Sequence, residues 1–198
     1  MDKIIFLDID GVLNSETDFI DSVYKYNPVH SKLQKGERWK VINVGMLAIL
    51  NDVVKQTGAK IVLSTTWRTK CDAKKLTKIF QRYGDIWEHG VDTIIGRTTD
   101  MKASRRYDPY SYSVPNIISE NEIRESEINL WMSENPVPES FIIIDDILMN
   151  FGSNMIHTDE FIGLTVEIGN KIISKLGRLP KYQRKFDKEY RHLWKGIV

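Results

Sequence analysis

Short apolar runs alternate along the chain with stretches in which apolar residues recur every three to four positions. The runs predict strands at residues 3–8, 60–64, 93–95, 141–145 and 161–166. The stretches between them predict helices at 43–58 and 72–83, and a third helix that begins at Ser119. This alternation is typical of an α/β protein whose parallel strands are joined by right-handed crossovers.

Local signals mark the ends of the predicted helices. Asn43 is a good N-cap for the first helix, and Gly58 is a typical residue just past a helix end. Ser119 and Glu122 stand at the spacing of a capping box, which predicts the start of the third helix. The buried stripe of this helix is predicted to contain Ile128, Trp131 and Met132.

Three segments interrupt the alternation. Residues 15–42 are a polar and aromatic insertion, which we expect to form a flap or small cap. Residues 98–118 carry arginines, tyrosines and prolines and predict a loop. The basic tail at 171–198 has aromatic residues at four-residue steps, which favours an amphipathic helix packed on a domain of residues 1–170. The alternative for both the loop and the tail is contact with nucleic acid.

Composition narrows the class of protein. The chain has 198 residues, 41% hydrophobic and 28% charged, which suits one α/β domain with a small insertion. Its formal net charge of +1 neither requires nor excludes a nucleic-acid partner. The single cysteine, Cys71, fits a reducing compartment. Because no signal-peptide pattern is present and no apolar run approaches the roughly 20 residues of a membrane span, we expect a cytoplasmic protein with no membrane partner.

The most informative stretch is IIFLDIDGVLN at residues 4–14. Its apolar part predicts a strand buried on both faces of a parallel sheet. Asp8 and Asp10 are two residues apart, so both carboxylates point to the same side at the end of that strand. Such a pair repels itself unless a cation lies between its members. A strand end followed by an Asp-Gly turn is the structural alternative, and the full run together with the later FIIIDD argues against it.

Further polar groups are expected at the same edge, because ligands of open parallel sheets bind outside the carboxyl ends of the strands. Ser64, Thr65, Trp67 and Arg68 follow the second strand, and Asp145 and Asp146 end the run FIIIDD. Arg124 lies in the first turn of a crossover helix, whose N-terminus returns to this edge. Helix capping by the two aspartates and a surface ion pair for Arg124 are the alternatives.

This set of groups predicts a chemistry. Four converging carboxylates require a divalent cation, and ligands that are all oxygen select a hard ion, of which Mg²⁺ fits best. The candidate ligands are Asp8, Asp10, Asp145 and Asp146. A hydroxyl and an arginine add donors suited to a phosphate group. The candidate phosphate contacts are Gly11, Ser64, Thr65, Arg68 and Arg124.

The motifs resemble those of the haloacid-dehalogenase-like (HAD) phosphohydrolases. IIFLDIDGVLN resembles the first motif of that superfamily, IVLSTTWR the second and FIIIDD the fourth. The similarity spans roughly residues 1–168 and is strongest with a small phage and bacterial branch, some of whose members are fused to nucleic-acid-repair enzymes. It implies a Rossmann-like three-layer sandwich with a mainly parallel five-stranded sheet. It also implies a small cap or none.

The resemblance implies a role for each matching residue. Asp8 corresponds to a nucleophile that forms an aspartyl-phosphate, and Asp10 to the acid and base that also gives a backbone carbonyl to the metal. Asp145, helped by Asp146, corresponds to a metal ligand, and Ser64 to the hydroxyl that binds the phosphoryl group. The third-motif cation is assigned to Arg124, with Arg97 and Lys102 as competing candidates. Val12 replaces the usual threonine without affecting the acids.

Three functional hypotheses follow. The leading one is a Mg²⁺-dependent phosphatase that acts through an aspartyl-phosphate on a nucleotide or a nucleic-acid 3′ end. The second is a metabolite phosphatase, which differs in substrate alone. The third is a catalytically silent module that binds phosphate or nucleic acid, but the presence of every catalytic acid argues against it.

Overall fold

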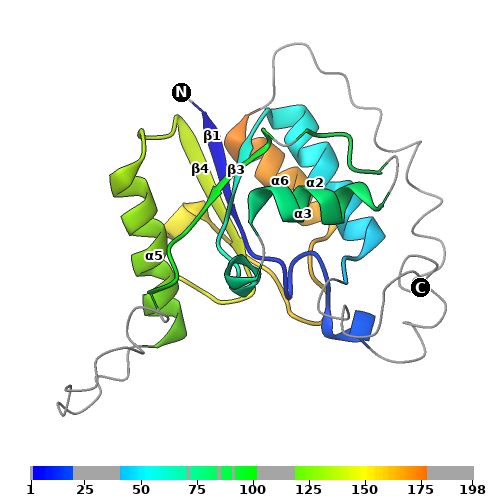
Figure 1. Cartoon of the computed structure of the whole chain (residues 1–198), viewed down its shortest axis with the longest axis horizontal. Helices are drawn as coiled ribbons and strands as arrows, with labels where there is room; N and C mark the ends of the chain where they lie inside the picture. Colours follow the sequence, from blue (N-terminus) through cyan, green and yellow to red (C-terminus); the bar gives the residue numbers. More distant parts are fainter. Residues whose placement is uncertain are drawn as a thin grey trace.

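The computed structural model describes residues 2–19, 41–70, 72–83, 86–90, 92–101 and 119–177. Its centre is a five-stranded sheet in which every pairing is parallel and the strand order is β3-β2-β1-β4-β5 (Figure 1). The strands are β1 (Lys3–Leu7), β2 (Lys60–Leu63), β3 (Ile94–Arg97), β4 (Ser140–Asp145) and β5 (Met155–His157).

Helices cover both faces of the sheet and complete the expected three layers (Figure 1). One face carries α2 (Val44–Thr57), α3 (Ala73–Gln81) and α6 (Val166–Leu176), and the other carries α5 (Glu120–Glu134). In the described part of the chain, short 3-10 helices connect these elements: η1 (Glu16–Phe19), η4 (Thr66–Thr69) and η6 (Gly152–Asn154). The predicted α/β class and parallel five-stranded sheet are confirmed.

The central strand β1 supplies both hydrophobic cores, because successive side chains point to opposite faces. Ile5 and Leu7 pack with α2, α3 and α6, whereas Ile4 and Phe6 pack against α5. Phe6 meets Trp131 of α5 edge to face, with ring centroids 5.3 Å apart. Burial on both sides holds the end of β1, which Asp8 and Asp10 follow, in a fixed place.

The helix ends confirm the local sequence signals. The Asn43 side chain accepts hydrogen bonds from the backbone of Gly45 and Met46 at the start of α2, and Gly58 ends that helix with a φ of 69°. Ser119 and Glu122 form the predicted capping box at the start of α5. No helix among the described segments combines the length and the apolar character needed to cross a membrane.

The fifth predicted strand is wrong. β5 lies earlier, at Met155–His157, and residues 161–166 instead form a turn and the start of α6. The carbonyl of Asp159 accepts hydrogen bonds from the amides of Ile162 and Gly163, and Gly163 has a φ of 69°. Phe161 and Ile162 are 53% and 58% exposed, so this apolar run follows a turn and is not buried in the sheet.

Some sequence predictions lie partly or wholly outside the described residues. These are most of the insertion at 15–42, most of the loop at 98–118 and the tail beyond residue 177. Residue 170, the predicted boundary between domain and tail, falls inside α6. The described part of the insertion consists of Ser15, η1 and the two residues that precede Asn43.

The contact between α2 and α6 depends on a glycine, which gives a first prediction. A Cβ at Gly169 would lie 2.6 Å from Cγ2 of Ile49 on α2. We expect Gly169→Ala to lower the free energy of unfolding by about 1–3 kcal/mol, the usual cost of overpacking. Chemical denaturation would measure this change.

A double-mutant cycle with Ile49→Ala provides the control, because that substitution removes the atom in conflict. The double variant should be less destabilised than the sum of the two single variants. Strict additivity would contradict the proposed clash.

Candidate active site

The ends of three neighbouring strands bring the main candidate residues together. Leu7 at the end of β1 pairs with Leu63 of β2 on one side and with Ile144 of β4 on the other. Asp8, Ser64 and Asp145, which follow these positions, therefore lie side by side at the carboxyl edge of the sheet. They are 2%, 0% and 0% exposed, so this arrangement is buried.

Arg124 reaches this cluster from α5, which covers the opposite face of the sheet from α2, α3 and α6. Its Nη1 atom donates to Oδ2 of Asp8 at 2.6 Å, to Oδ2 of Asp145 at 2.6 Å and to the carbonyl of Ser64 at 3.0 Å. The side chain is itself buried, because Arg124 is 5% exposed. Residues separated by over a hundred positions in sequence thus share one guanidinium group.

Of the two alternative cations, Arg97 does not take this position. Nη1 of Arg97 donates to the carbonyl of Arg68 at 2.5 Å, so it supports the loop after β2. Lys102 lies outside the described residues. The geometry therefore favours Arg124 as the cation of the carboxylate cluster.

The charges in this cluster do not balance locally. Burial opposes the charge on Arg124, but Asp8 and Asp145 outweigh it and raise the pKa of the guanidinium. Burial and the neighbouring Asp8 raise the pKa of Asp145 to about 8, although Arg124 acts in the opposite direction. The pKa of Asp146 is also raised, first by burial and then by Asp8. One guanidinium is thus too little positive charge for three carboxylates.

A divalent cation fits this group of residues. Asp8, Asp145 and Asp146 each offer a carboxylate oxygen, and these oxygens all lie within 4.8 Å of one another. The donors are hard oxygen atoms, which suit Mg²⁺, and a cation would offset the repulsion that raises the carboxyl pKa values. The side chain of Asp10, another predicted metal ligand, does not belong to this group.

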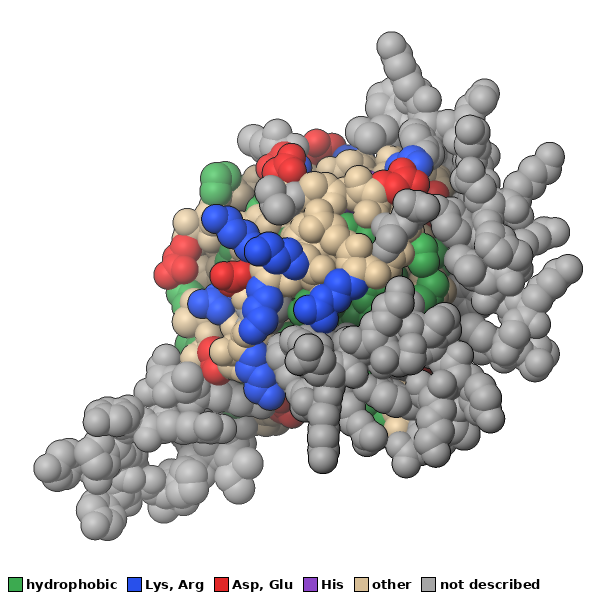
Figure 2. Space-filling model, turned by 45° about the vertical axis from the view of Figure 1, so that its right-hand side comes forward, with side chains coloured by type: hydrophobic (Ala, Val, Ile, Leu, Met, Phe, Trp, Pro, Cys, Tyr) green, Lys and Arg blue, Asp and Glu red, His purple; other side chains and the backbone are tan. Residues whose placement is uncertain are grey.

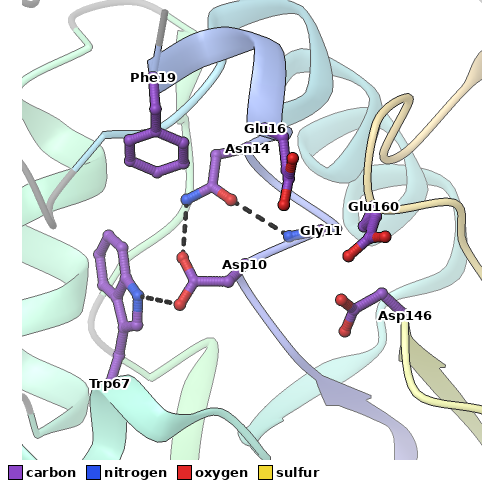
Figure 3. A pocket seen from close by; sticks show the side chains of 8 residues that line it. All are labelled: Asp10, Gly11, Asn14, Glu16, Phe19, Trp67, Asp146 and Glu160. Atoms are coloured by element: carbon purple, nitrogen blue, oxygen red, sulfur yellow. Dashed lines mark hydrogen bonds between the residues drawn. The ribbon is translucent and has the colours of Figure 1, made fainter.

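Asp10 is instead held by two neutral donors in an adjoining pocket (Figure 3). Nδ2 of Asn14 donates to its Oδ1 at 2.9 Å, and Nε1 of Trp67 donates to its Oδ2 at 2.9 Å. Burial raises the pKa of Asp10, while both hydrogen bonds act to lower it. The carboxyl group is therefore fixed in direction, and its pKa is above that of a solvated aspartate.

Gly11 permits the close approach of two segments. Its φ is 70°, and an added Cβ would lie 2.6 Å from Oδ2 of Asp146. Its carbonyl accepts a hydrogen bond from the Thr158 hydroxyl, and its amide donates to Asn14. In this structure the amide of Gly11, a predicted phosphate contact, thus binds a side chain.

The pocket beside Asp10 has two chemically different sides (Figure 3). Its volume is about 410 Å³. Trp67 and Phe19 form an aromatic side, whereas Glu16, Glu160 and Asp146 supply carboxylates on the other side. The sequence reasoning did not identify Asn14, Glu16, Phe19 or Glu160. Asn14 ends the first motif, and its place in that run was the one available signal.

Comparison with protein families decides the affiliation of this chain. Residues 4–168 match the model of the family described as the HAD domain in Swiss Army Knife RNA repair proteins. The chain belongs to this family. Comparison with curated proteins and with solved structures gave no match. HAD domains are generally hydrolases or phosphatases, and the group of three aspartates can hold a metal.

The second motif of this HAD domain contributes one unpaired buried hydroxyl. Oγ of Ser64 has no hydrogen-bond partner among the described residues, although Ser64 is fully buried. Leaving a buried hydroxyl unpaired costs free energy, so such a group suggests a ligand. Thr65 differs, because its Oγ1 accepts from the amide of Trp67 and caps η4.

Arg68 has a structural partner in this HAD domain. Its Nη2 donates to Oε2 of Glu127 at 2.5 Å, and its Nη1 donates to the carbonyl of Thr65 at 2.7 Å. The other oxygen of Glu127 accepts from the amide of Met101. Both charged groups are buried, so this pair fastens the loop after β2 to α5. Nε of Arg68 has no hydrogen-bond partner among the described residues, and phosphate contact by Arg68 stays a prediction.

The carboxylate cluster predicts that Mg²⁺ stabilises the protein in a pH-dependent way. The pKa of Asp145 is about 8 in the folded protein and about 4 in an unfolded chain, so protonation of this carboxyl favours the folded state. This contribution to the free energy of unfolding is complete below about pH 4 and is lost as the pH rises toward 8. Mg²⁺ binds the ionised form. We therefore expect about 10 mM Mg²⁺ to raise the melting temperature more at pH 8 than at pH 5.

Thermal unfolding with and without Mg²⁺ would measure this effect, with Asp145→Asn and Asp92→Asn as a matched pair of variants. Asp92 is an exposed carboxylate next to the amino end of β3, away from the cluster. The first substitution should remove most of the Mg²⁺ effect and the second should preserve it. Equal shifts in both variants would place the metal elsewhere.

Proposed function

We propose that this HAD domain is a Mg²⁺-dependent phosphatase, which hydrolyses a phosphate monoester on a nucleotide or a nucleic-acid 3′ end. The observation that carries the proposal is the buried cluster of Asp8, Asp145 and Arg124, beside the unpaired hydroxyl of Ser64. The nucleic-acid substrate is supported by the description of the family as a domain of RNA repair proteins.

Asp8 is the proposed nucleophile, and its surroundings keep it in one orientation. Its Oδ1 accepts from the amide of Ile9 at 2.7 Å, and its Oδ2 accepts from Arg124. Attack on phosphorus forms an aspartyl-phosphate and breaks the bond to the leaving oxygen. Arg124 and the Ser64 hydroxyl supply preorganised donors for charge that develops on the phosphoryl oxygens. Bound Mg²⁺ would be held by Asp8, Asp145 and Asp146 and would offset the repulsion between carboxylate and phosphate.

Asp10 is the proposed acid and base. Protonated, it gives its proton to the leaving alcohol, and as a carboxylate it then takes a proton from the water that hydrolyses the aspartyl-phosphate. Its raised pKa supports the first role because it favours the protonated form. Its place on the pocket wall puts the leaving alcohol in the 410 Å³ pocket.

The nucleophile gives the first functional prediction. We expect Asp8→Asn to lower kcat for a generic phosphate ester on the order of 10³-fold or more, because the amide is not a nucleophile. The change should preserve the fold, since the two side chains have nearly the same shape. Hydrolysis assays and circular dichroism would measure the two properties.

The control for this variant is Asp92→Asn, which makes the same chemical change at an exposed position. Mass spectrometry would exclude reversion of the amide to the acid. Full activity of Asp8→Asn in protein shown to be pure and intact would remove Asp8 from its proposed role.

The hydrogen bond from Trp67 to Asp10 gives a second functional prediction. Trp67→Phe keeps an aromatic ring and removes the N–H group that orients the acid. Proton donation matters for a poor leaving group and little for nitrophenolate. We expect kcat/KM for a nucleoside 3′-monophosphate to fall by about tenfold or more, while that for p-nitrophenyl phosphate changes by less than about threefold.

Trp131→Phe is the matched control, because Trp131 packs against Phe6 on the α5 side of the sheet. It should leave the ratio of the two kcat/KM values unchanged. If Trp67→Phe lowers both values by the same factor, Trp67 supports the loop alone and does not position the acid.

A further inference from the structure

The exposed side of α3 carries a row of positive charges. Lys74, Lys78 and Arg82 are spaced four residues apart, so they lie on one side of the helix at steps of about 6 Å. Lys75 and Lys70 extend the row, and all five side chains are exposed. We call this surface the basic face of α3. Figure 2 shows Lys and Arg side chains gathered in a band on this side of the molecule.

The packing of α3 on the sheet does not require Lys74 and Lys78, the central residues of this row. The buried side of α3 is formed by apolar residues such as Leu76, Ile79 and Phe80, and it gives the helix its place on the sheet. Like charges four residues apart on a helix repel each other and lower its stability. Between residues 70 and 82 the one acidic residue is Asp72, which caps the helix by accepting from the amide of Lys75. The row therefore invites a functional explanation.

The basic face of α3 begins close along the chain to the aromatic side of the active-site pocket. Trp67 lies in η4, and Lys70 directly follows that short helix. The opposite side of the pocket carries Glu16 and Glu160 (Figure 3). A polyanion with one end in the pocket is thus repelled on the side of the glutamates and attracted on the side of α3.

We propose that the basic face of α3 holds the phosphodiester backbone of a single-stranded polynucleotide whose terminal phosphate is at Asp8. The inference rests on the proposed phosphatase function for the position of that end. The terminal sugar occupies the pocket beside Asp10, and the remaining chain leaves across Trp67 toward Lys74 and Lys78. The cations contact phosphates, so the surface selects a polymer without selecting its base sequence.

The test compares Lys74→Glu/Lys78→Glu with Lys171→Glu/Lys175→Glu, which makes the same charge change on exposed residues of α6. The substrates are a 3′-phosphorylated oligonucleotide of about ten residues, as RNA and as DNA, and a nucleoside 3′-monophosphate. At about 50 mM salt, we expect the α3 variant to lower kcat/KM for the oligonucleotides by about tenfold or more. The value for the mononucleotide should stay within about twofold.

A binding measurement separates this inference from the phosphatase proposal. Fluorescence anisotropy with an end-labelled oligonucleotide in wild type, the α3 variant and the α6 variant requires no turnover. Removing two phosphate contacts should flatten the salt dependence of binding by about 1.4 in the slope of log K against log salt. Weaker binding in the α3 variant alone supports the surface even if no ester is hydrolysed.

Two results would overturn the inference. One is phosphatase activity on the oligonucleotide that is equal in wild type and the α3 variant. The other is an equal or larger loss of kcat/KM for the oligonucleotides in the α6 variant, which would place the polymer on α6 and not on α3. Circular dichroism and the unchanged mononucleotide rate would show that the α3 variant is folded.

Discussion

The structure depends on one buried guanidinium group shared by two carboxylates. Taking charges out of water costs several kcal/mol per ion unless they are paired with good geometry. Nη1 of Arg124 satisfies Asp8, Asp145 and the Ser64 carbonyl at once, and so joins the ends of β1, β2 and β4 to the first turns of α5. The pairing is incomplete in charge, because Asp146 adds a third carboxylate. This deficit of positive charge weakens the region when no metal is bound, and it also makes the region a suitable site for a cation.

A second contact of α5 connects this helix to the loop after β2 as well as to the carboxylate cluster. Glu127 lies one turn beyond Arg124 and forms the buried pair with Arg68. Arg124 therefore holds Ser64 by its carbonyl, while Glu127 holds the loop four residues later. Between these anchors lies Trp67, whose indole N–H orients Asp10. A small movement of α5 would change the positions of Asp10 and Asp8 together.

The parts of the fold and site that depend on the spacing of apolar residues and on the positions of strand ends could be predicted from the sequence. Four strands, the helix caps and the meeting of Asp8, Ser64, Arg124 and Asp145 follow from those rules. The fifth strand failed because residues 161–166 have an apolar composition, yet the turn at Gly163 leaves Phe161 and Ile162 exposed. The partners of Arg68 and Asp10 could not be predicted, because they depend on side-chain directions across elements. A basic residue near a phosphate motif has the same sequence signal whether it binds substrate or Glu127.

Burial of Asp8, the proposed nucleophile, limits the form of substrate that the proposed reaction can accept. Asp8 is 2% exposed, whereas Asp10 and Asp146 line the adjoining pocket. A terminal phosphate is small on three sides and can approach a recessed carboxylate with its ester oxygen facing outward. An internal phosphodiester carries a second sugar on one of the other phosphoryl oxygens, and that sugar would have to fit against the buried surroundings of Asp8. Access alone thus favours terminal monoesters, and it leaves the body of any polymer outside, where the charges on the surface determine its direction.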